Sequence, residues 1–567
     1  MHKHPPKMAP QTSPNAHAIF LEASRIFFHH YHNKPYTLFN PALFHTKAKS
    51  DLIPQFLQFA FIATAVRFSS QLQWKQRKQK TIDSYAQCSW ELIMSSPEGL
   101  GESDSSDVSV IQALALLAII DATAGRRRAA WVKIGMAVRI SQDLGMMGEV
   151  QAGISREERE ERRGLFWSLF LLDRFVCCSF RRPPAIKIED CRLRLPVDRL
   201  LKQTESAMTL GELLDEKVRG KANKVVGLSG LSVGFAALLG RTIECMMNDE
   251  HKTIEPWRID SDYSTIYKSL EALKEMADAY APNTRSPDQD TNTQLPHSDR
   301  TSHFVLSLTL YHLTHCILSH PFLLGMKRQT YAFTPTAWIH AQYASCWGHA
   351  QALTTLVVDA KAAGYMLAPS FYSYCILVAG TVHAILLHGE DKPASERAAK
   401  YLKTSRDYLC EISEMWQNAY IMSDALRFFT NRCVRYSGIL LGPSDRIQDL
   451  TETDITVLRS VLDYWNMMDP KNPVSELDSI NIDCFARTNT PESNRKDDLP
   501  SLGSDGEMSG GSDVSREEVF TVDPGVLGGG VLSLSSPGRE GEGSDSDMNI
   551  GMGEFAKWDW GNELDIM

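Results

Sequence analysis

The sequence predicts an all-α protein: a large multi-helix array of antiparallel helical hairpins, followed by a disordered acidic C-terminal tail. Three observations predict this fold class. Residues 16–470 are rich in Leu, Ala, Met and Gln and contain few alternating β-branched runs, which favours helices. Short connections that contain glycine join apolar helical segments, as in antiparallel helix pairs. From about residue 471 the chain is dominated by Gly, Ser, Asp and Glu, which bury too little apolar surface to fold.

The charge of the chain changes in the same region. The 567 residues together have a net charge of −10. Residues 488–567 contain 17 Asp and Glu but only 5 Lys and Arg, a net charge of −12, so the rest of the chain is near +2. Composition therefore predicts four parts: a flexible leader at 1–15, a helical body at 16–470 that contains a polar linker at 280–302, a disordered linker at 471–550, and a tail at 551–567.

Membrane and secreted classes are disfavoured. The first residues are polar and proline-rich and contain no apolar segment of a signal peptide. Residues 304–324 and 371–389 are apolar, but they carry histidines and hydroxyls and lack the flanking tryptophans and basic loop of a membrane span. We interpret both as helices buried in protein, and we expect no membrane partner. The eleven cysteines are scattered, apart from Cys177 and Cys178, which indicates a reducing compartment.

Residues 111–125 and 126–145 predict a helical hairpin. Both segments end at a glycine, which is the residue that most easily takes the left-handed conformation beyond a helix end. The apolar residues of the second segment fall roughly on one face, and they are Trp131, Ile134, Val138 and Leu144.

The next segment predicts a longer helix with a polar pair inside an apolar run. Ser155 and Glu158 form a capping box at its start, and Pro183 with Pro184 should end it. Asp173 and Arg174 lie deep in the apolar run, where charges need partners, so we expect each to bond a neighbouring helix or loop. We predict a structural clasp formed by Arg163, Trp167, Asp173, Arg174, Arg182 and Pro183.

A set of aromatic, glycine, arginine and proline positions runs through this central region. The set comprises Trp131, Gly135, Ala137, Arg139, Leu144, Gly145, Glu158, Arg162, Arg163, Trp167, Leu172, Asp173, Arg174, Arg182, Pro183, Ile186, Asp190, Cys191, Leu195 and Pro196. It resembles the middle homology region of fungal-specific transcription factors, the large helical domain downstream of a six-cysteine binuclear zinc cluster. The similarity spans about residues 18–440, and Gly164 and Arg181 depart from the family's pattern.

The resemblance implies a nuclear regulator of RNA polymerase II genes, in a metabolic or secondary-metabolite pathway. It also implies homo- or heterodimers with related regulators, and DNA binding through a zinc cluster. The cysteines here cannot form that cluster: the first is Cys88, and apart from the adjacent pair, neighbours lie thirteen or more residues apart. Either the sequence is a truncated version of the gene product, or the protein tunes a full-length relative without touching DNA. We expect no cofactor in this chain, and zinc only with an upstream cluster.

Weak candidates for DNA contact are the cations of the segment QWKQRKQK, namely Lys75, Arg77, Lys78 and Lys80. A solvated helix face is the favoured interpretation of this segment. DNA would therefore be a partner only through an upstream reader.

The sequence does not favour an enzyme. No nucleophile elbow, P-loop or dinucleotide fingerprint occurs, so no catalytic residue is predicted. The helical spacing of His312, His315, Cys316 and His320 places the outer pair about 12 Å apart along the axis, too far for one zinc ion. We interpret them as core histidines and predict no metal site.

The last residues, GEFAKWDWGNELDIM, alternate acids with apolar and aromatic side chains. The pattern is typical of a segment that stays solvated and offers its rings to a partner groove, here the transcription machinery. The alternative is a C-terminal helix that docks on its own body. The predicted activation residues are Phe555, Trp558, Trp560 and Leu564.

Overall fold

The computed structural model describes residues 14–69, 77–95, 108–149, 153–180, 182–197, 207–219, 224–248, 254–280, 297–329, 331, 333–365, 370–441 and 448–469. All of them belong to one structural unit. They form helices joined by loops, and their only β contacts are two isolated bridges. The all-α prediction is confirmed.

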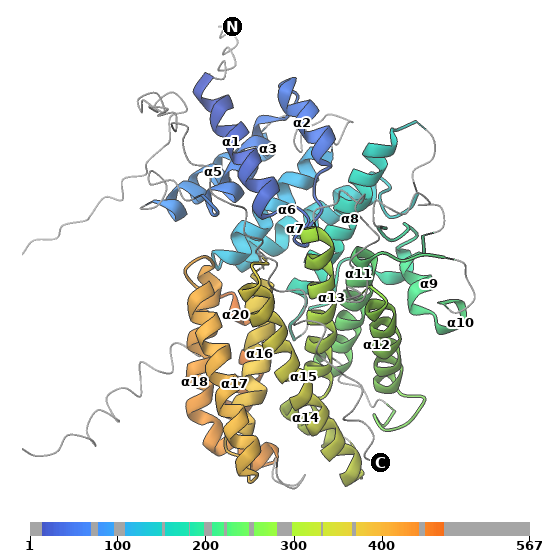
Figure 1. Ribbon diagram of the computed structural model, residues 1–567, viewed down its shortest axis with the longest axis vertical. Helices are drawn as coiled ribbons and strands as arrows, with labels where there is room; N and C mark the ends of the chain where they lie inside the picture. Colours follow the sequence, from blue (N-terminus) through green and yellow to red (C-terminus); the bar gives the residue numbers. More distant parts are fainter. Residues whose placement is uncertain are drawn as a thin grey trace, which may run out of the picture. The chain divides into compact units, whose positions relative to one another are not determined.

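The N-terminal helices lie together at one end of the ribbon (Figure 1), and their side chains form an aromatic core. They are α1 (Pro14–His30), α2 (Pro41–Lys49), α3 (Gln55–Val66) and α5 (Lys78–Ser95). Helix α3 is apolar on nearly every side because it packs between α1, α5 and α6. Its Phe61 ring lies 4.2 Å from that of Phe27 and stacks on Phe44 at 4.7 Å between centroids.

The predicted hairpin is formed by α6 (Val108–Thr123) and α7 (Arg127–Asp143), which pack along each other. Gly125 and Gly145 follow the two helices with φ values of 77° and 65°, so the predicted glycine ends are confirmed. The predicted apolar face is only partly correct. Ile134 and Val138 are buried, but Trp131 is 43% exposed because it lies at the edge of the C-terminal helices.

Helix α8 (Arg156–Val176) begins with the predicted capping box, in which Ser155 and Glu158 bond each other's backbone. From Gly164 onwards it is buried on all sides, because α11 (Leu228–Ile243) and other segments surround it. The predicted end at Pro183 is wrong, since the helix ends at Val176. The reason is a distant carboxylate: Asp463 accepts hydrogen bonds from the residues just beyond the helix, Ser179 and Phe180.

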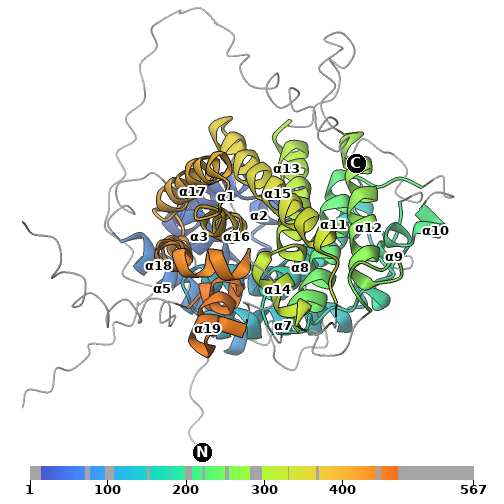
Figure 2. The ribbon, with the colours of Figure 1, turned by 90° about the horizontal axis from the view of Figure 1, so that it is seen from below.

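The remaining helices pack largely in chain order (Figure 2), with α11 on α13, α13 on α15, α15 on α16, and α16 on both α17 and α18. They are α9 (Leu210–Leu214), α10 (Glu216–Arg219), α11, a π-helical turn (Glu244–Asn248), α12 (Asp262–Asp278), α13 (His297–Leu318), α14 (Pro321–Arg328), α15 (Thr336–Ala362), α16 (Phe371–Leu386), α17 (Lys392–Ile412), α18 (Gln417–Leu440), α19 (Glu452–Leu462) and α20 (Tyr464–Met467).

Two sequence interpretations concern these helices. Helix α13 begins at His297, inside the predicted linker 280–302. The helix extends upstream of its apolar part through several polar residues, and it begins at the residue that follows Pro296. Helix α16 is buried, as expected of residues 371–389. Among the described residues, Leu228–Met247 has the length and mean hydropathy of a membrane span, and 78% of that window is buried inside the protein.

Candidate functional site

The predicted polar pair forms a closed clasp at the end of α8. Arg174 Nη1 donates to Asp173 Oδ2 at 2.7 Å, and Arg174 Nη2 donates to the carbonyl of Ile186 at 2.5 Å. The Asp173 carboxylate also accepts from the backbone N–H groups of Ala185 at 2.9 Å and Ile186 at 3.1 Å. Both side chains are 2% exposed. The pair therefore ties the following loop to the helix and is closed to solvent.

Burial dominates the electrostatics of the clasp. It raises the pKa of Asp173, while Arg174 and the two backbone N–H groups act in the opposite direction. Burial also lowers the pKa of Arg174, against the effect of Asp173. The Arg174 guanidinium lies 4.2 Å over the Phe170 ring. On its other side Gly240 of α11 makes room, since a Cβ there would stand 2.9 Å from Arg174 Cδ.

Two more predicted clasp residues fix the same loop further along. Trp167 Nε1 donates to the carbonyl of Arg194 at 2.9 Å. Arg163 bridges Glu160 at 2.9 Å and Glu149 at 2.7 Å. Glu149 in turn accepts from the Arg194 backbone N–H at 3.0 Å, so the two anchors share one loop residue.

Arg182 and Pro183 differ from the predicted roles. Pro183 is exposed and lies beyond the helix end. Arg182 does not join the Asp173 network; its guanidinium lies 3.4 Å over the ring of Trp465, which belongs to α20. It therefore connects the loop to the C-terminal helices instead of to α8.

Sequence reasoning missed the C-terminal half of this arrangement. Asp463 lies 284 residues beyond Ser179 in the sequence. Its carboxylate nevertheless accepts hydrogen bonds from Ser179 Oγ at 2.9 Å and from Phe180 N at 3.2 Å. Tyr464 N donates to the Cys178 carbonyl at 2.9 Å. The only sequence signal was the acidic residue before an aromatic pair, DYW, which has no specific local meaning.

Gly164, noted as a departure from the family pattern, has a clear packing role. A Cβ at this position would stand 2.9 Å from the backbone oxygen of Thr37. The same segment is held by Ser168 Oγ, which accepts from Thr37 N at 2.8 Å. The N-terminal chain therefore crosses α8 at the closest approach that a glycine permits.

Replacing Gly164 with Ala is expected to destabilise the protein by about 1–3 kcal/mol, because the obstacle is backbone and not a flexible side chain. The matched control is Gly348→Ala in α15, where nothing lies within 4 Å of the added Cβ and the better helix propensity should stabilise by up to about 1 kcal/mol. Urea unfolding of both variants checks the opposite signs. Equal effects of the two substitutions would contradict the crossing.

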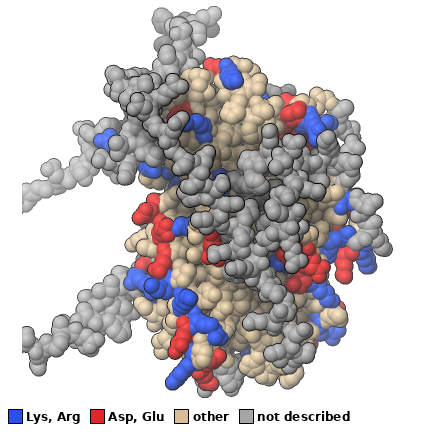
Figure 3. All heavy atoms as spheres, viewed as in Figure 1, with Lys and Arg blue, Asp and Glu red and all other residues tan. Residues whose placement is uncertain are grey.

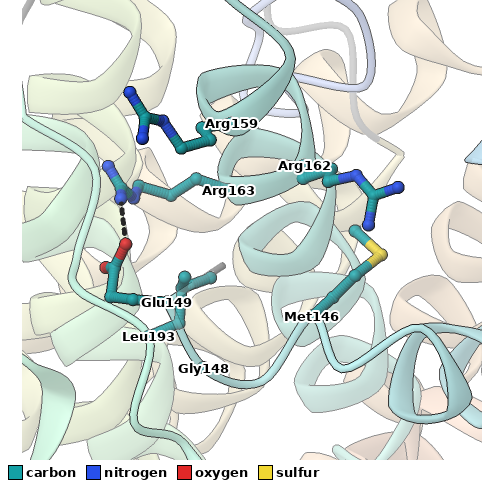
Figure 4. A pocket seen from close by; sticks show the side chains of 7 residues that line it. All are labelled: Met146, Gly148, Glu149, Arg159, Arg162, Arg163 and Leu193. Carbon is teal, nitrogen blue, oxygen red and sulfur yellow. Dashed lines mark hydrogen bonds and ion pairs between the residues drawn. The ribbon is translucent and has the colours of Figure 1, made fainter. Parts of the chain in front are cut away.

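A small surface depression adjoins the clasp, at the first turns of α8 (Figure 4). Arg159, Arg162 and Arg163 line it together with Met146, Gly148, Glu149 and Leu193. Arg163 is engaged with Glu149 across it, while Arg162 extends on the opposite side, near Met146. The carboxylates interspersed along this helix leave little net charge, so the depression does not form a strong anion site.

The weak DNA-contact candidates are placed as follows. Lys75 lies outside the described residues. Arg77 and Lys80 are exposed at the start of α5, and Lys78 Nζ donates to the carbonyl of Arg67 at 3.1 Å. On the face drawn in Figure 3, the coloured basic and acidic side chains are intermixed instead of forming one basic band. DNA contact by these cations stays a prediction.

The arginines at the start of α7 have acidic partners on neighbouring segments. Arg126 pairs with Asp121 at 2.7 Å and with Asp83 at 2.8 Å. Arg127 pairs with Asp469. These contacts join the hairpin to α5 and to the end of α20.

The clustered histidines lie in the core. His312 Nδ1 is 2.9 Å from His349 Nδ1, and the rings of His315 and His349 stack at 4.0 Å. His320 instead faces Thr381 at 3.2 Å and caps α14. Among the described residues no group of three or more His, Cys, Asp or Glu side chains is placed to hold a metal ion.

The fold and the clasp define a helical scaffold domain in which the charged pair serves architecture. Comparison with known proteins identifies the domain: residues 25–275 match the profile of the fungal specific transcription factor domain. Residues 25–275 therefore carry a domain like that of the fungal transcription regulators, and the relatives that the chain resembles are named as transcriptional regulators. These matches indicate a regulatory protein and not an enzyme.

Three relatives illustrate the similarity. An uncharacterised transcriptional regulatory protein of Schizosaccharomyces pombe is 27% identical over 44% of this chain and 27% of its own length. A Zn(2)-C6 fungal-type transcription factor of Fusarium oxysporum is 21% identical over 71% of this chain and 44% of its own. The ascochitine biosynthesis cluster transcriptional regulator of Didymella fabae is 28% identical over 35% of this chain and 34% of its own. The chain thus spans less than half the length of each of these relatives.

Proposed function

We propose that this regulator acts in the nucleus on RNA polymerase II genes of a metabolic or secondary-metabolite pathway. The match of residues 25–275 to the family profile supports the regulatory role, and the similarity to a regulator named for a biosynthetic cluster supports the kind of pathway. The helical body serves as the scaffold for regulation. The acidic tail, with Phe555, Trp558, Trp560 and Leu564, recruits the transcription machinery.

The observation that carries the proposal is the closed clasp. Asp173 and Arg174 lie inside the family domain and are fully used in bonds to each other and to the loop at Ile186. A charged pair used in this way stabilises a scaffold. The pair lies within residues 25–275, which match the family profile.

A second candidate is an interaction protein that tunes a full-length zinc-cluster relative. The favouring observation is the use of the cysteines: Cys178, Cys316 and Cys375 are fully buried, and burial raises the pKa of each thiol well above its ordinary value. These thiols serve the core and are not poised as metal ligands. Sequencing the 5′ end of the transcript separates the candidates, since an upstream cysteine cluster favours the first.

The tail's role is tested by fusing the full chain to a foreign DNA-binding domain and measuring a reporter gene. We expect activation several-fold above the DNA-binding domain alone, and loss of most of it in the Trp558→Ala/Trp560→Ala variant. The matched control is Asn562→Ala/Met567→Ala in the same segment, which should retain activity. Undiminished activation without the two indole rings would remove this role from the tail.

A further inference from the structure

A basic and aromatic surface lies where α7 meets the C-terminal helices. We call it the arginine–tryptophan surface, and it consists of Arg127, Arg128, Trp131, Val132, Arg182 and Trp465. Three separate segments supply it: the start of α7, the loop after α8, and α20. The sequence predicted Arg182 as a clasp residue, but its guanidinium lies at this surface instead.

The rings and guanidinium groups of this surface are stacked in alternation. Arg182 lies 3.4 Å from the centroid of the Trp465 ring and 5.1 Å from that of Trp131. The two indoles meet edge to face at 6.1 Å, and Arg127 lies 5.4 Å from Trp465 on α20. This arrangement holds the exposed Trp131 in a fixed orientation.

The outer side of the surface is open and apolar. Trp131 is 43% exposed and Val132 53% exposed, an unusual pair of neighbouring large side chains on one helix. One turn further along, a Cβ at Gly135 would meet nothing within 4 Å. The exposed strip therefore continues along α7 from Arg128 to Gly135.

Positive charge is in excess here. The pKa of Arg182 is lowered, first by burial and then by the neighbouring charges of Arg127 and Arg128, with Asp463 acting in the opposite direction. Asp463 already accepts from Ser179, Phe180 and Asn466. Asp469 pairs with Arg127. Among the described residues no carboxylate lies within ion-pair distance of Arg128 or Arg182, so the surface favours an acidic partner.

The chain itself contains an acidic segment that fits this surface. The last residue that the structure describes also lies at this surface. Asp469, the last described residue, is bonded to Arg127. Beyond it, residues 553–567 contain four acids and one lysine, interleaved with Phe555, Trp558 and Trp560. The sequence between Asp469 and residue 553 is 83 residues long, and a random coil of that length has a root-mean-square span of about 50 Å, enough to reach back.

We propose that the arginine–tryptophan surface is the docking site of the chain's own C-terminal segment 553–567. The carboxylates of the segment pair with Arg128 and Arg182, and its indoles stack on the guanidinium groups and on Trp131. A nearer acidic segment, residues 476–485, has the same net charge but no tryptophan, so it cannot form the stacked contacts. The docking holds whether or not the tail activates transcription.

The test is photo-crosslinking in the full chain, with a benzophenone amino acid in place of Trp560 and mapping by mass spectrometry. We expect crosslinks to residues 128–135 within one chain. The variant Arg128→Glu/Val132→Asp changes two exposed positions and should lower the crosslinking yield about tenfold. Adding Asp559→Lys in the tail of that variant should restore part of the yield, because the two charges are then opposite again. The matched control is Lys403→Glu on the exposed face of α17, which should change nothing.

Each outcome decides the proposal. Crosslinks to α7 that depend on Arg128 support it. Crosslinks between two chains overturn it in favour of a second copy as the occupant. Crosslinks to other surfaces, or a yield that is the same in the charge-reversed variant, overturn it outright. The reporter assay measures activation by the tail, whereas the crosslink measures docking of the tail on the arginine–tryptophan surface. A negative result in one experiment therefore does not decide the other proposal.

Discussion

Lowering the pH from 7.5 to 5 is expected to remove several kcal/mol of folding stability. The cause is a set of histidines buried in their neutral form. Burial lowers the pKa of His303 to about 4 and of His320 and His383 to about 3. It also lowers the pKa of His312 and His349 well below the ordinary value. All five pKa shifts have the same direction.

The sign of the effect follows from the unfolded chain, in which histidine titrates near pH 6.5. Above that pH neither state binds the protons, and the stability is intact. Below that pH the histidines bind protons in the unfolded state but not in the folded state. The free energy of unfolding therefore falls by about 1.4 kcal/mol per pH unit for each histidine. At pH 5, His303, His320 and His383 together lower the free energy of unfolding by about 6 kcal/mol. Since whole domains are stable by about 5–15 kcal/mol, this loss brings the protein near unfolding.

The contacts of His320 explain why its ring stays unprotonated in the folded state. Its Nδ1 accepts the Phe322 backbone N–H at 3.3 Å as the N-cap of α14, and its Nε2 lies 3.2 Å from Thr381 Oγ1. A protonated ring has no acceptor left, so the cap would be lost. Asp173 and Asp463, whose pKa values burial raises, act in the opposite direction, because the folded state binds their protons more readily than the unfolded chain does.

Urea unfolding at a series of pH values checks this prediction. His320→Asn retains a cap acceptor without a titrating ring, so the slope of stability against pH should fall by about 1.4 kcal/mol per unit. His340→Asn, at an exposed position of α15, is the control and should leave the slope unchanged. An unfolding midpoint that is constant between pH 7.5 and 5 would refute the neutral burial of these rings.

Local signals were sufficient for the parts of the fold that local chemistry decides. The capping box at Ser155 and the glycine ends at Gly125 and Gly145 were predictable because each depends on residues a few positions apart. The Asp173–Arg174 pair was predictable as a polar contact because burying a charge demands a partner, and its partners at Ala185 and Ile186 lie just downstream.

Long-range contacts account for the errors. The end of α8 at Val176 depends on Asp463, which follows α8 in the sequence only after the described helices α9 to α19. The exposure of Trp131 likewise depends on Trp465, which covers one edge of its ring and leaves the rest open. Periodicity within a single helix contains no information about such partners. The arginine–tryptophan surface was invisible in sequence for the same reason.

Removing the acid of the clasp is expected to have the largest effect of any single substitution discussed. Asp173→Ala should destabilise the protein by about 3–5 kcal/mol, because a guanidinium that is 2% exposed loses its counter-charge. The backbone N–H groups of Ala185 and Ile186 lose their acceptor at the same time. Arg174→Met should cost less, since the remaining carboxylate keeps both of those N–H bonds.

Urea unfolding of the two variants tests the order, and limited trypsin digestion tests the mechanism. Cleavage at Lys187 and Arg192 should be faster in Asp173→Ala, because the clasp holds their loop to α8 through Ile186. Asp190→Ala is the matched control: its side chain is exposed in the same loop, and its loss should change stability by less than about 0.5 kcal/mol. If Asp173→Ala were as mild as this control, or Arg174→Met the more damaging of the pair, the carboxylate would not be the centre of the clasp.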